Sequence, residues 1–350
     1  MKSAVGVVSS AVLASGIAGA QPAADQPMRP PSVPLVACDP YFSIWSPADR
    51  LNDVDTTHWT GKPHRLSSSA TIDGKSYRVI GGAGVAGAAM TQKSLAVLPT
   101  RTIYAFEEAG VALTLTFLTA ALPDDIDILS RPVTYLTYEF SATDGKQHDV
   151  AFSFDAGGEL AVNVREQEVT CATEKAGGLT ALRIGSKEQN VLGKAGDDIR
   201  IDWGFLYVAA PVADVASAQI VDVVGLRSNG AMTEIKAPAP GGSVAAVLTF
   251  KVGKVSREPV SRWLMLAYDD LYSIQYLGKN LRPYWRRNGW EAADLLKASA
   301  NDYEALVPRC AEFDKELMAD LEAAGGLKYA KICALAYRQC FAAGKFVVDE

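Results

Sequence analysis

The sequence predicts a mainly β protein with a C-terminal α part, in the form of a large antiparallel β-sandwich followed by helices. Between about residues 66 and 255, apolar and polar residues alternate in short runs, such as Val111, Leu113, Leu115 and Phe117. This is the period of strands with one buried face. After about residue 255 the period lengthens to three or four, which is typical of helices. With 350 residues, 49% of them hydrophobic, the chain has enough apolar material for a sizeable core.

Turn signals separate the predicted strands. Asp73-Gly74, Asp144-Gly145 and Asn229-Gly230 each place residues that accept a positive φ between two alternating runs. Because no helical pattern intervenes, the strands are expected to pair antiparallel.

The C-terminal part contains three predicted helices. Apolar residues at helical spacing predict an amphipathic helix over residues 261–277, with Gly278 as its C-cap. Two more helices follow within residues 300–350, separated by Gly325-Gly326. The second of them is apolar on nearly every side, so we expect further protein to enclose it and the chain to be an incomplete part of a longer helical domain. Between the helix predicted over residues 261–277 and the two later helices, the aromatic and basic residues 284–290 either stack on a polar ligand or link the helices to the sandwich.

The first 34 residues predict export. Lys2, the small apolar run Ala4 to Ile17 and the Ala18-Gly19-Ala20 cleavage site form a secretory signal peptide over residues 1–20. Residues 21–34, rich in Pro and Ala, are expected to form a disordered spacer. No other segment is apolar enough to cross a bilayer, so we expect a secreted or periplasmic protein with no membrane partner. The net charge of −6 argues against a nucleic-acid partner.

The sequence predicts no metal site and no cofactor. Its five cysteines are widely spread, without a C-x-x-C motif or a Cys/His cluster. Gly81-Gly82-Ala83-Gly84 lacks the lysine of a phosphate-binding loop. Asp124, Asp125 and Asp127 carry oxygens that calcium accepts, but their spacing is not that of an EF-hand, so a solvated acidic loop is the preferred interpretation.

The stretch Asp197 to Gly204 concentrates charge between the alternating runs. Strand spacing would place Ile199, Ile201 and Trp203 on one face, with Asp198, Arg200 and Asp202 on the other. The charged face is either a solvated surface or one wall of a polar ligand pocket.

His58 lies in a Thr-Thr-His-Trp-Thr-Gly loop, where its imidazole and the Trp59 indole could converge on a ligand. A packed structural histidine is the alternative. No G-x-S-x-G motif supports a Ser/His/Asp triad.

Several motifs resemble those of the secreted glutaminase A family of fungi and bacteria. In the same order as in that family, the sequence carries Pro34 to Ser46, His58-Trp59-Thr60-Gly61, Leu122 to Val133, Asp197 to Gly204, Ala267-Tyr268-Asp269-Asp270 and Leu335 to Gln339. The resemblance covers nearly all of the predicted mature chain. It implies a β-sandwich followed by an (α/α) toroid of the six-hairpin glycosidase-like type, of which this chain holds only the first helical hairpin.

The resemblance also implies a domain plan and a function. The plan is a sandwich over residues 35–258, a helical linker over 259–299 and the start of the toroid over 300–350. The implied activity is hydrolysis of glutamine to glutamate and ammonia. Two alternatives stay open, namely a six-hairpin glycoside hydrolase and a non-catalytic carbohydrate-binding sandwich. The catalytic acid and base are expected beyond residue 350, in the missing toroid, so this chain alone is expected to be inactive. The small-molecule substrate, glutamine or a glycan, is expected to contact His58, Trp59, Asp202, Trp203, Tyr41 and Arg131.

Overall fold

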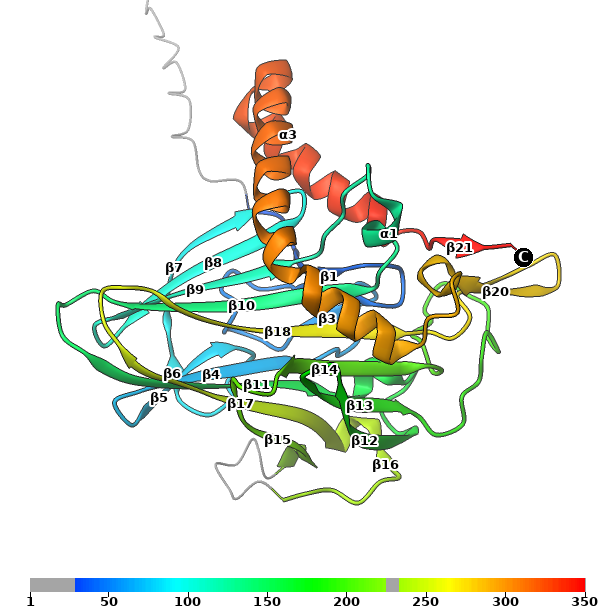
Figure 1. Cartoon of the computed structure of the whole chain (residues 1–350), viewed down its shortest axis with the longest axis horizontal. Helices are drawn as coiled ribbons and strands as arrows, with labels where there is room; N and C mark the ends of the chain where they lie inside the picture. The colour runs from blue at the N-terminus through cyan, green and yellow to red at the C-terminus, as the bar shows by residue number, and fades with distance from the viewer. Residues whose placement is uncertain (1–28, 225–232, 350) are drawn as a thin grey trace, which may run out of the picture.

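The computed structural model describes residues 29–224 and 233–349 (Figure 1). The predicted signal peptide, most of the predicted spacer and the Asn229-Gly230 turn lie outside these described residues. Within them, two large sheets pack face to face and a helical hairpin covers the outer face of the larger sheet (Figure 1). The predicted fold class, an antiparallel sandwich followed by helices, is confirmed.

The larger sheet has nine strands. In spatial order they are β16 (Ala239–Pro240), β12 (Glu168–Ala176), β13 (Leu179–Ser186), β14 (Phe205–Pro211), β18 (Val260–Asp269), β10 (Val133–Ala142), β9 (Val111–Leu118), β8 (Arg101–Glu108) and β7 (Thr91–Val97). The second sheet has six: β15 (Val215–Asp222), β17 (Val244–Val255), β11 (His148–Gly157), β4 (Leu66–Ile72), β5 (Lys75–Ile80) and β6 (Ala88–Ala89). All these neighbours pair antiparallel except β5 and β6, which are parallel.

Two small sheets and several short helices complete the described fold. One small sheet consists of β1 (Val33–Ala37), β2 (Ser43–Ser46) and β3 (Thr57–His58), and the other of β19 (Ile274–Tyr276), β20 (Lys279–Pro283) and β21 (Val347–Val348). The helices are α1 (Ile126–Leu129), the 3-10 turns η1 (Gly158–Ala161), η2 (Gly241–Ser243) and η3 (Tyr284–Arg286), and the long α3 (Ala292–Ala342).

The sandwich interior follows the predicted alternation. Val111, Leu113, Leu115 and Phe117 of β9 are all buried, and the Phe152 ring of β11 stacks between Tyr138 of β10 and Phe250 of β17. The predicted Asp73-Gly74 turn joins β4 to β5, with a positive φ at both residues.

The helix predicted over residues 261–277 is wrong, because β18 occupies most of that range. β18 lies in the middle of the nine-stranded sheet, between β14 and β10. Leu264, Leu266 and Tyr268 face the sandwich core, whereas Met265 and Ala267 face the helical hairpin. A strand that is buried on both faces loses its period-two signature, so its apolar residues fall at helical spacings by coincidence. Gly278 is a hairpin-turn residue between β19 and β20 rather than a helix cap.

The predicted domain boundaries move accordingly. Regular structure begins at Val33 with β1 of a small sheet, inside the predicted spacer, and the sandwich continues past residue 258 to Asp269. Most of the predicted helical linker is therefore strand, loop and 3-10 turn, and continuous helix starts only at Ala292.

The stretch Asp197 to Gly204 is not a strand. It is an irregular segment that ends where β14 begins at Phe205. Side chains satisfy its backbone in place of a neighbouring strand: Arg200 N donates to Asn163 Oδ1 over 3.0 Å, and Gly204 N donates to Gln189 Oε1 over 2.7 Å. Arg200 and Asp202 are buried whereas Asp198 is exposed, so the three charged residues do not form one solvated strand face.

α3 forms the predicted helical hairpin. Gly326 has a φ of 79° and a ψ of 172°, which breaks the helix into a first arm (residues 292–325) and a second arm (residues 327–342). The second arm turns back beside the first (Figure 1), and the rings of Phe313 and Tyr337 pack 5.8 Å apart between them. The first arm contacts the sheet through Leu295, Tyr303 and their neighbours.

Candidate functional site

Five separate parts of the chain meet beside the second arm of α3. They are the loop after β1, the loop after α1, the loop after β18, the junction of β20 with η3, and residues 343–348, which we call the return segment. Together they line a cavity of about 30 Å³, which we call the junction cavity. Its lining includes Cys38, Asp39, Ser130, Arg131, Asp270, Ser273, Trp285 and Lys345.

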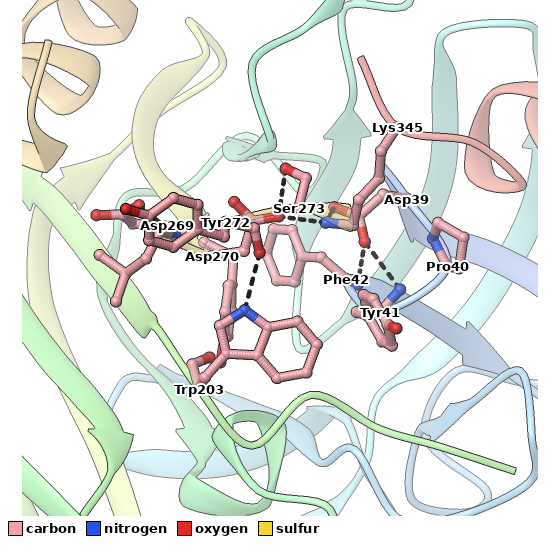
Figure 2. Close-up of polar contacts among 12 residues, drawn as sticks. Asp39, Pro40, Tyr41, Phe42, Trp203, Asp269, Asp270, Tyr272, Ser273 and Lys345 are labelled. Atoms are coloured by element: carbon pink, nitrogen blue, oxygen red, sulfur yellow. Dashed lines mark hydrogen bonds and ion pairs between the residues drawn. The ribbon is translucent and has the colours of Figure 1, made fainter. Parts of the chain in front are cut away.

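The centre of this junction is a buried lysine (Figure 2). Lys345 Nζ lies 2.6 Å from Asp270 Oδ2 and 3.1 Å from Asp39 Oδ2. It also lies 5.3 Å from the centroid of the Tyr41 ring, within cation–π range. Burial lowers the pKa of Lys345, but the two carboxylates outweigh it and raise the pKa, so the ammonium stays charged. We call Asp39, Asp270 and Tyr41 the lysine cage.

Local hydrogen bonds orient each carboxylate of the lysine cage. Asp39 Oδ1 accepts the backbone N–H groups of Tyr41 and Phe42 over 2.8 and 2.9 Å, which is an Asx-type turn. Asp270 Oδ2 accepts the Ser273 hydroxyl over 2.7 Å. The second oxygen, Asp270 Oδ1, is buried and has no hydrogen-bond partner within the described residues.

The neighbouring Asp269 has a different role. Its carboxylate pairs with Arg286, whose Nε donates to Oδ1 over 3.1 Å. Burial raises the pKa of Asp269, although Arg286 opposes the rise. Gly204 passes so close that a Cβ there would lie 2.1 Å from the Asp269 carbonyl oxygen, and its φ is +75°. Glycine is therefore required where the 197–204 segment crosses the end of β18.

Tyr41 and Trp203, both predicted from the sequence, contact each other. Their ring centroids lie 5.2 Å apart in an edge-to-face arrangement. Trp203 is 1% exposed, donates its indole N–H to the Tyr272 carbonyl over 3.0 Å and accepts the Tyr268 hydroxyl on its own carbonyl. Trp203 thus supports Tyr41 from behind, and Tyr41 presents its ring to the ammonium.

His58 and Trp59 meet at the carbonyl oxygen of Pro40. His58 Nε2 lies 2.9 Å from this oxygen and Trp59 Nε1 donates to it over 2.7 Å. A carbonyl only accepts, so Nε2 of His58 carries the proton. Burial lowers the pKa of His58 to about 4, and its Nδ1 lies 3.0 Å from Thr60 Oγ1. His58 is therefore neutral and packed, whereas Trp59 is 53% exposed.

The two remaining predicted residues lie in different surroundings. Arg131 lines the junction cavity, pairs with Asp302 over 2.7 Å and places its guanidinium over the Trp290 ring. Asp202 is buried away from solvent and accepts from Gln167 and Lys194, each over 3.0 Å. The structure thus brings Tyr41 and Arg131 to the junction, places Trp203, His58 and Trp59 against the loop that carries Tyr41, and gives Asp202 partners of its own.

A larger hollow, of about 320 Å³, lies beside Arg65, Asn163 and Arg200. Its two buried cations already have partners. Arg65 pairs with Glu159 and donates to the Gly242 carbonyl, and Arg200 pairs with Asp198. The two buried arginines of this hollow, like Lys345 at the junction cavity, are each paired with a carboxylate.

Comparison with known proteins identifies the family. Residues 100–320, more than half of the chain, match the family described as a domain of unknown function, DUF5127. The chain belongs to the DUF5127 family. Residues 5–90 match a second domain of unknown function, DUF4964. The DUF5127 match runs from β8 into the first arm of α3, so it includes strands of both sheets, without β4 to β7, and part of the helical hairpin.

Glutaminase A of Aspergillus oryzae (strain ATCC 42149 / RIB 40) is a relative of this DUF5127 protein. The two are 25% identical over 339 residues, which cover 91% of this chain and 49% of the fungal protein. The resemblance to the glutaminase A family is thereby confirmed, and it supports a hydrolase-like family. The chain spans about half the length of this relative.

Two solved structures show weak similarity to the chain. One is described as a kojibiose phosphorylase from the human microbiome, with a TM-score of 0.42, 10% identity, and coverage of 83% of this chain and 34% of that one. The other is the α-galactosidase AgaB of Geobacillus stearothermophilus, with a TM-score of 0.23, 10% identity, and coverage of 61% and 29%. At these scores neither structure bears on function.

Sequence reasoning missed the most charged residues of the junction in this DUF5127 chain. Asp39 could have been identified from the sequence, because it precedes Pro40-Tyr41 within a motif shared with the glutaminase A family. Asp270 lies within residues 261–277, for which the sequence predicts a helix, and this prediction hides its position at the end of β18. Lys345 carried no local signal, because only the fold brings the return segment to the loop after β1.

The acidic loop after β9 has arginine partners. Asp124 and Asp125 pair with Arg309 of α3, and Asp127 pairs with Arg287. These contacts link the loop to α3 and η3, while the Asp124 and Asp127 side chains stay exposed, in agreement with the solvated acidic loop that the sequence suggested. Among the described residues, no group of three or more His, Cys, Asp or Glu side chains could hold a metal ion. Over the same residues, no helix is long and apolar enough to cross a membrane.

Proposed function

We propose that this chain is the N-terminal part of a secreted glutaminase A-like hydrolase, which converts glutamine to glutamate and ammonia. The observation that carries the proposal is the junction cavity, where Asp39, Asp270, Arg131 and Lys345 converge from four parts of the chain. Glutamine presents an ammonium, a carboxylate and a carboxamide, and a site with charges of both signs is complementary to such a molecule. The relationship to Glutaminase A supports the same activity.

The size of the cavity limits what it can bind. A space of about 30 Å³ holds one small polar group or one or two waters rather than a whole amino acid. We therefore propose that the sandwich binds only one end of the substrate. Amide hydrolysis also needs an activated water or nucleophile and donors for the oxyanion. We propose that these groups come from the half of the relative's length that this chain does not match.

The six predicted binding residues divide into two roles in this proposal. Tyr41 and Arg131 contact the substrate directly, because both lie at the lysine cage or the junction cavity. Trp203, His58, Trp59 and Asp202 hold the wall and its approach in place.

A second candidate function, glycan binding, rests on Trp59. Its ring is 53% exposed, and its N–H is held by the Pro40 carbonyl, so a rigid aromatic surface faces solvent. Such a surface stacks on sugar rings. This observation favours a carbohydrate-binding sandwich or a glycoside hydrolase over an amidase.

One assay separates the candidates. The longest product of the gene, with residues 1–350 beside it, is tested for ammonia release from L-glutamine and for release from a panel of aryl glycosides. We expect the longest product to release ammonia from glutamine. Arg131→Met should lower kcat/KM by about tenfold or more, because a charged hydrogen bond disappears. The exposed control Lys146→Gln should leave kcat/KM unchanged. Sugar release without ammonia, abolished by Trp59→Ala, would establish the second candidate and reject the first.

A further inference from the structure

The lysine cage holds a primary ammonium that belongs to a side chain of the same protein. We propose that Asp39, Asp270 and Tyr41 form a binding site for a primary ammonium group, which Lys345 fills in this structure and which a ligand fills when Lys345 leaves. Two carboxylates and an aromatic face are the groups that recognise such a cation.

The cage is organised without help from Lys345. Two backbone N–H groups fix the Asp39 carboxylate, the Ser273 hydroxyl fixes Asp270, and the Trp203 ring supports Tyr41. Removing the lysine would leave these contacts in place and two carboxylates facing a space without a counter-charge (Figure 2). Since an unpaired buried carboxylate is costly, the empty cage should take up a cation.

Lys345 can leave without unfolding the helix that precedes it. α3 ends at Ala342, and Gly344 has open space around its Cβ position. Beyond Lys345, the return segment is held by the hydrogen bond from Tyr284 N to the Phe346 carbonyl over 2.8 Å and by the pairing of β21 with β20. A swing of a few residues between these two points is enough to empty the cage.

The geometry selects a primary ammonium over other cations. Lys345 Nζ uses two of its three N–H donors on Asp39 and Asp270. The third acceptor available at the junction is Asp270 Oδ1, which is buried and has no partner among the described residues. A quaternary ammonium has no N–H to donate, so it forfeits these hydrogen bonds, and its methyl groups hold its charge farther from the two carboxylates. The tethered lysine competes at high effective concentration, so a free ligand needs contacts outside the cage to displace it.

The test uses Lys345→Ala in the 1–350 chain, with ethylammonium chloride as the probe and tetramethylammonium chloride at equal ionic strength as the control. We expect ethylammonium to raise the Tm of the variant in a saturable way, by at least about 2 °C, with no such effect from tetramethylammonium or on the unsubstituted protein. Lys345→Ala combined with Asp270→Asn should lose the response. Equal responses to both salts, or a response that survives Asp270→Asn, would overturn the proposal.

A second variant covers the case in which Lys345→Ala does not fold. Lys345→Met keeps the apolar stem and leaves room for the ammonium ion alone. Its Tm should rise with ammonium chloride and stay level with tetramethylammonium chloride. If no variant that folds responds to its probe, ethylammonium for Lys345→Ala or ammonium for Lys345→Met, the site is rejected.

The identification of the natural ligand as an amino acid rests on the proposed function. A further experiment tests the ammonium site and the glutaminase activity separately. L-glutamine should stabilise Lys345→Ala, whereas its analogue without the α-amino group should not. Stabilisation by ethylammonium but not by glutamine would keep the ammonium site and remove glutamine as its ligand. Ammonia release without any ammonium response would keep the enzyme and reject the site.

Discussion

The two faces of the nine-stranded sheet are stabilised in different ways. The inner face packs on the six-stranded sheet through apolar side chains, with Phe152 stacked 4.2 Å from Tyr138 and 4.4 Å from Phe250. The outer face also has apolar contacts to α3, such as the stacking of Trp263 on Tyr303. Around them, however, ion pairs join residues that are far apart in the sequence. The inner face is thus defined by burial, and the outer face also depends on matching of charge.

β18 shows why this difference matters. It contributes to both interiors, so the two faces cannot be separated by removing one element. Substitutions on either side of the sheet can nevertheless test whether burial and charge matching differ in strength.

The largest expected effect is on the inner face. Phe152→Ala removes a ring that is stacked on both sides, and we expect it to lower the free energy of unfolding by about 3–5 kcal/mol. Urea denaturation followed by circular dichroism measures the change. Val164→Ala, at a site that is 46% exposed, is the matched control and should change the free energy by less than about 0.5 kcal/mol. A cost below about 1 kcal/mol for Phe152→Ala would show that the inner face is loosely packed.

The next effect concerns the loop that carries Tyr41. Burial depresses the pKa of His58 from 6.5 to about 4, so the unfolded chain takes up this proton at a higher pH than the folded one. Stability therefore falls as the pH drops from about 6.5 to 4, by about 3 kcal/mol for this group. His58→Gln should remove that part of the pH dependence while leaving the part due to carboxylates. Parallel stability curves for the two proteins from pH 7 to pH 4 would contradict a buried, neutral His58.

The smallest of the three effects tests charge matching on the outer face. Asp314 accepts the N–H and hydroxyl of Thr100, the latter over 2.9 Å, and the Arg101 guanidinium over 2.7 Å. Asp314→Ala leaves these donors unpaired, and we expect a cost of about 1–3 kcal/mol in urea denaturation. Arg101→Met in the same background should recover part of it, because it removes the unpaired charge. An additive double variant would show that the pair does not couple the hairpin to the sheet.

The inner face could be predicted from the sequence because its signal is local. The alternation in β9 and the Asp73-Gly74 turn each depend on consecutive residues, and both appear in the structure. The break at Gly326 was also visible, since two glycines interrupt a long apolar stripe. Each of these features needs only the chemistry of a few neighbours.

The outer face and the junction could not be predicted in the same way. β18 has apolar residues on both faces, and their spacing in the sequence therefore resembles that of a helix. Tyr41 and Arg131 were found through motifs, but the position of Lys345 depends on how the whole hairpin returns to the sandwich. A pairing between distant residues has no periodicity, so a single sequence does not contain a local trace of it.

The meeting of Asp39 with Lys345 also has a consequence for biosynthesis. Asp39 leaves the ribosome with the first strands, whereas Lys345 emerges about 300 residues later. Until Lys345 is made, Asp39 and the later Asp270 lack its positive charge, so water must continue to solvate this corner of the nascent protein. Water can leave this corner only when the lysine arrives, so burial of the two carboxylates follows synthesis of the return segment.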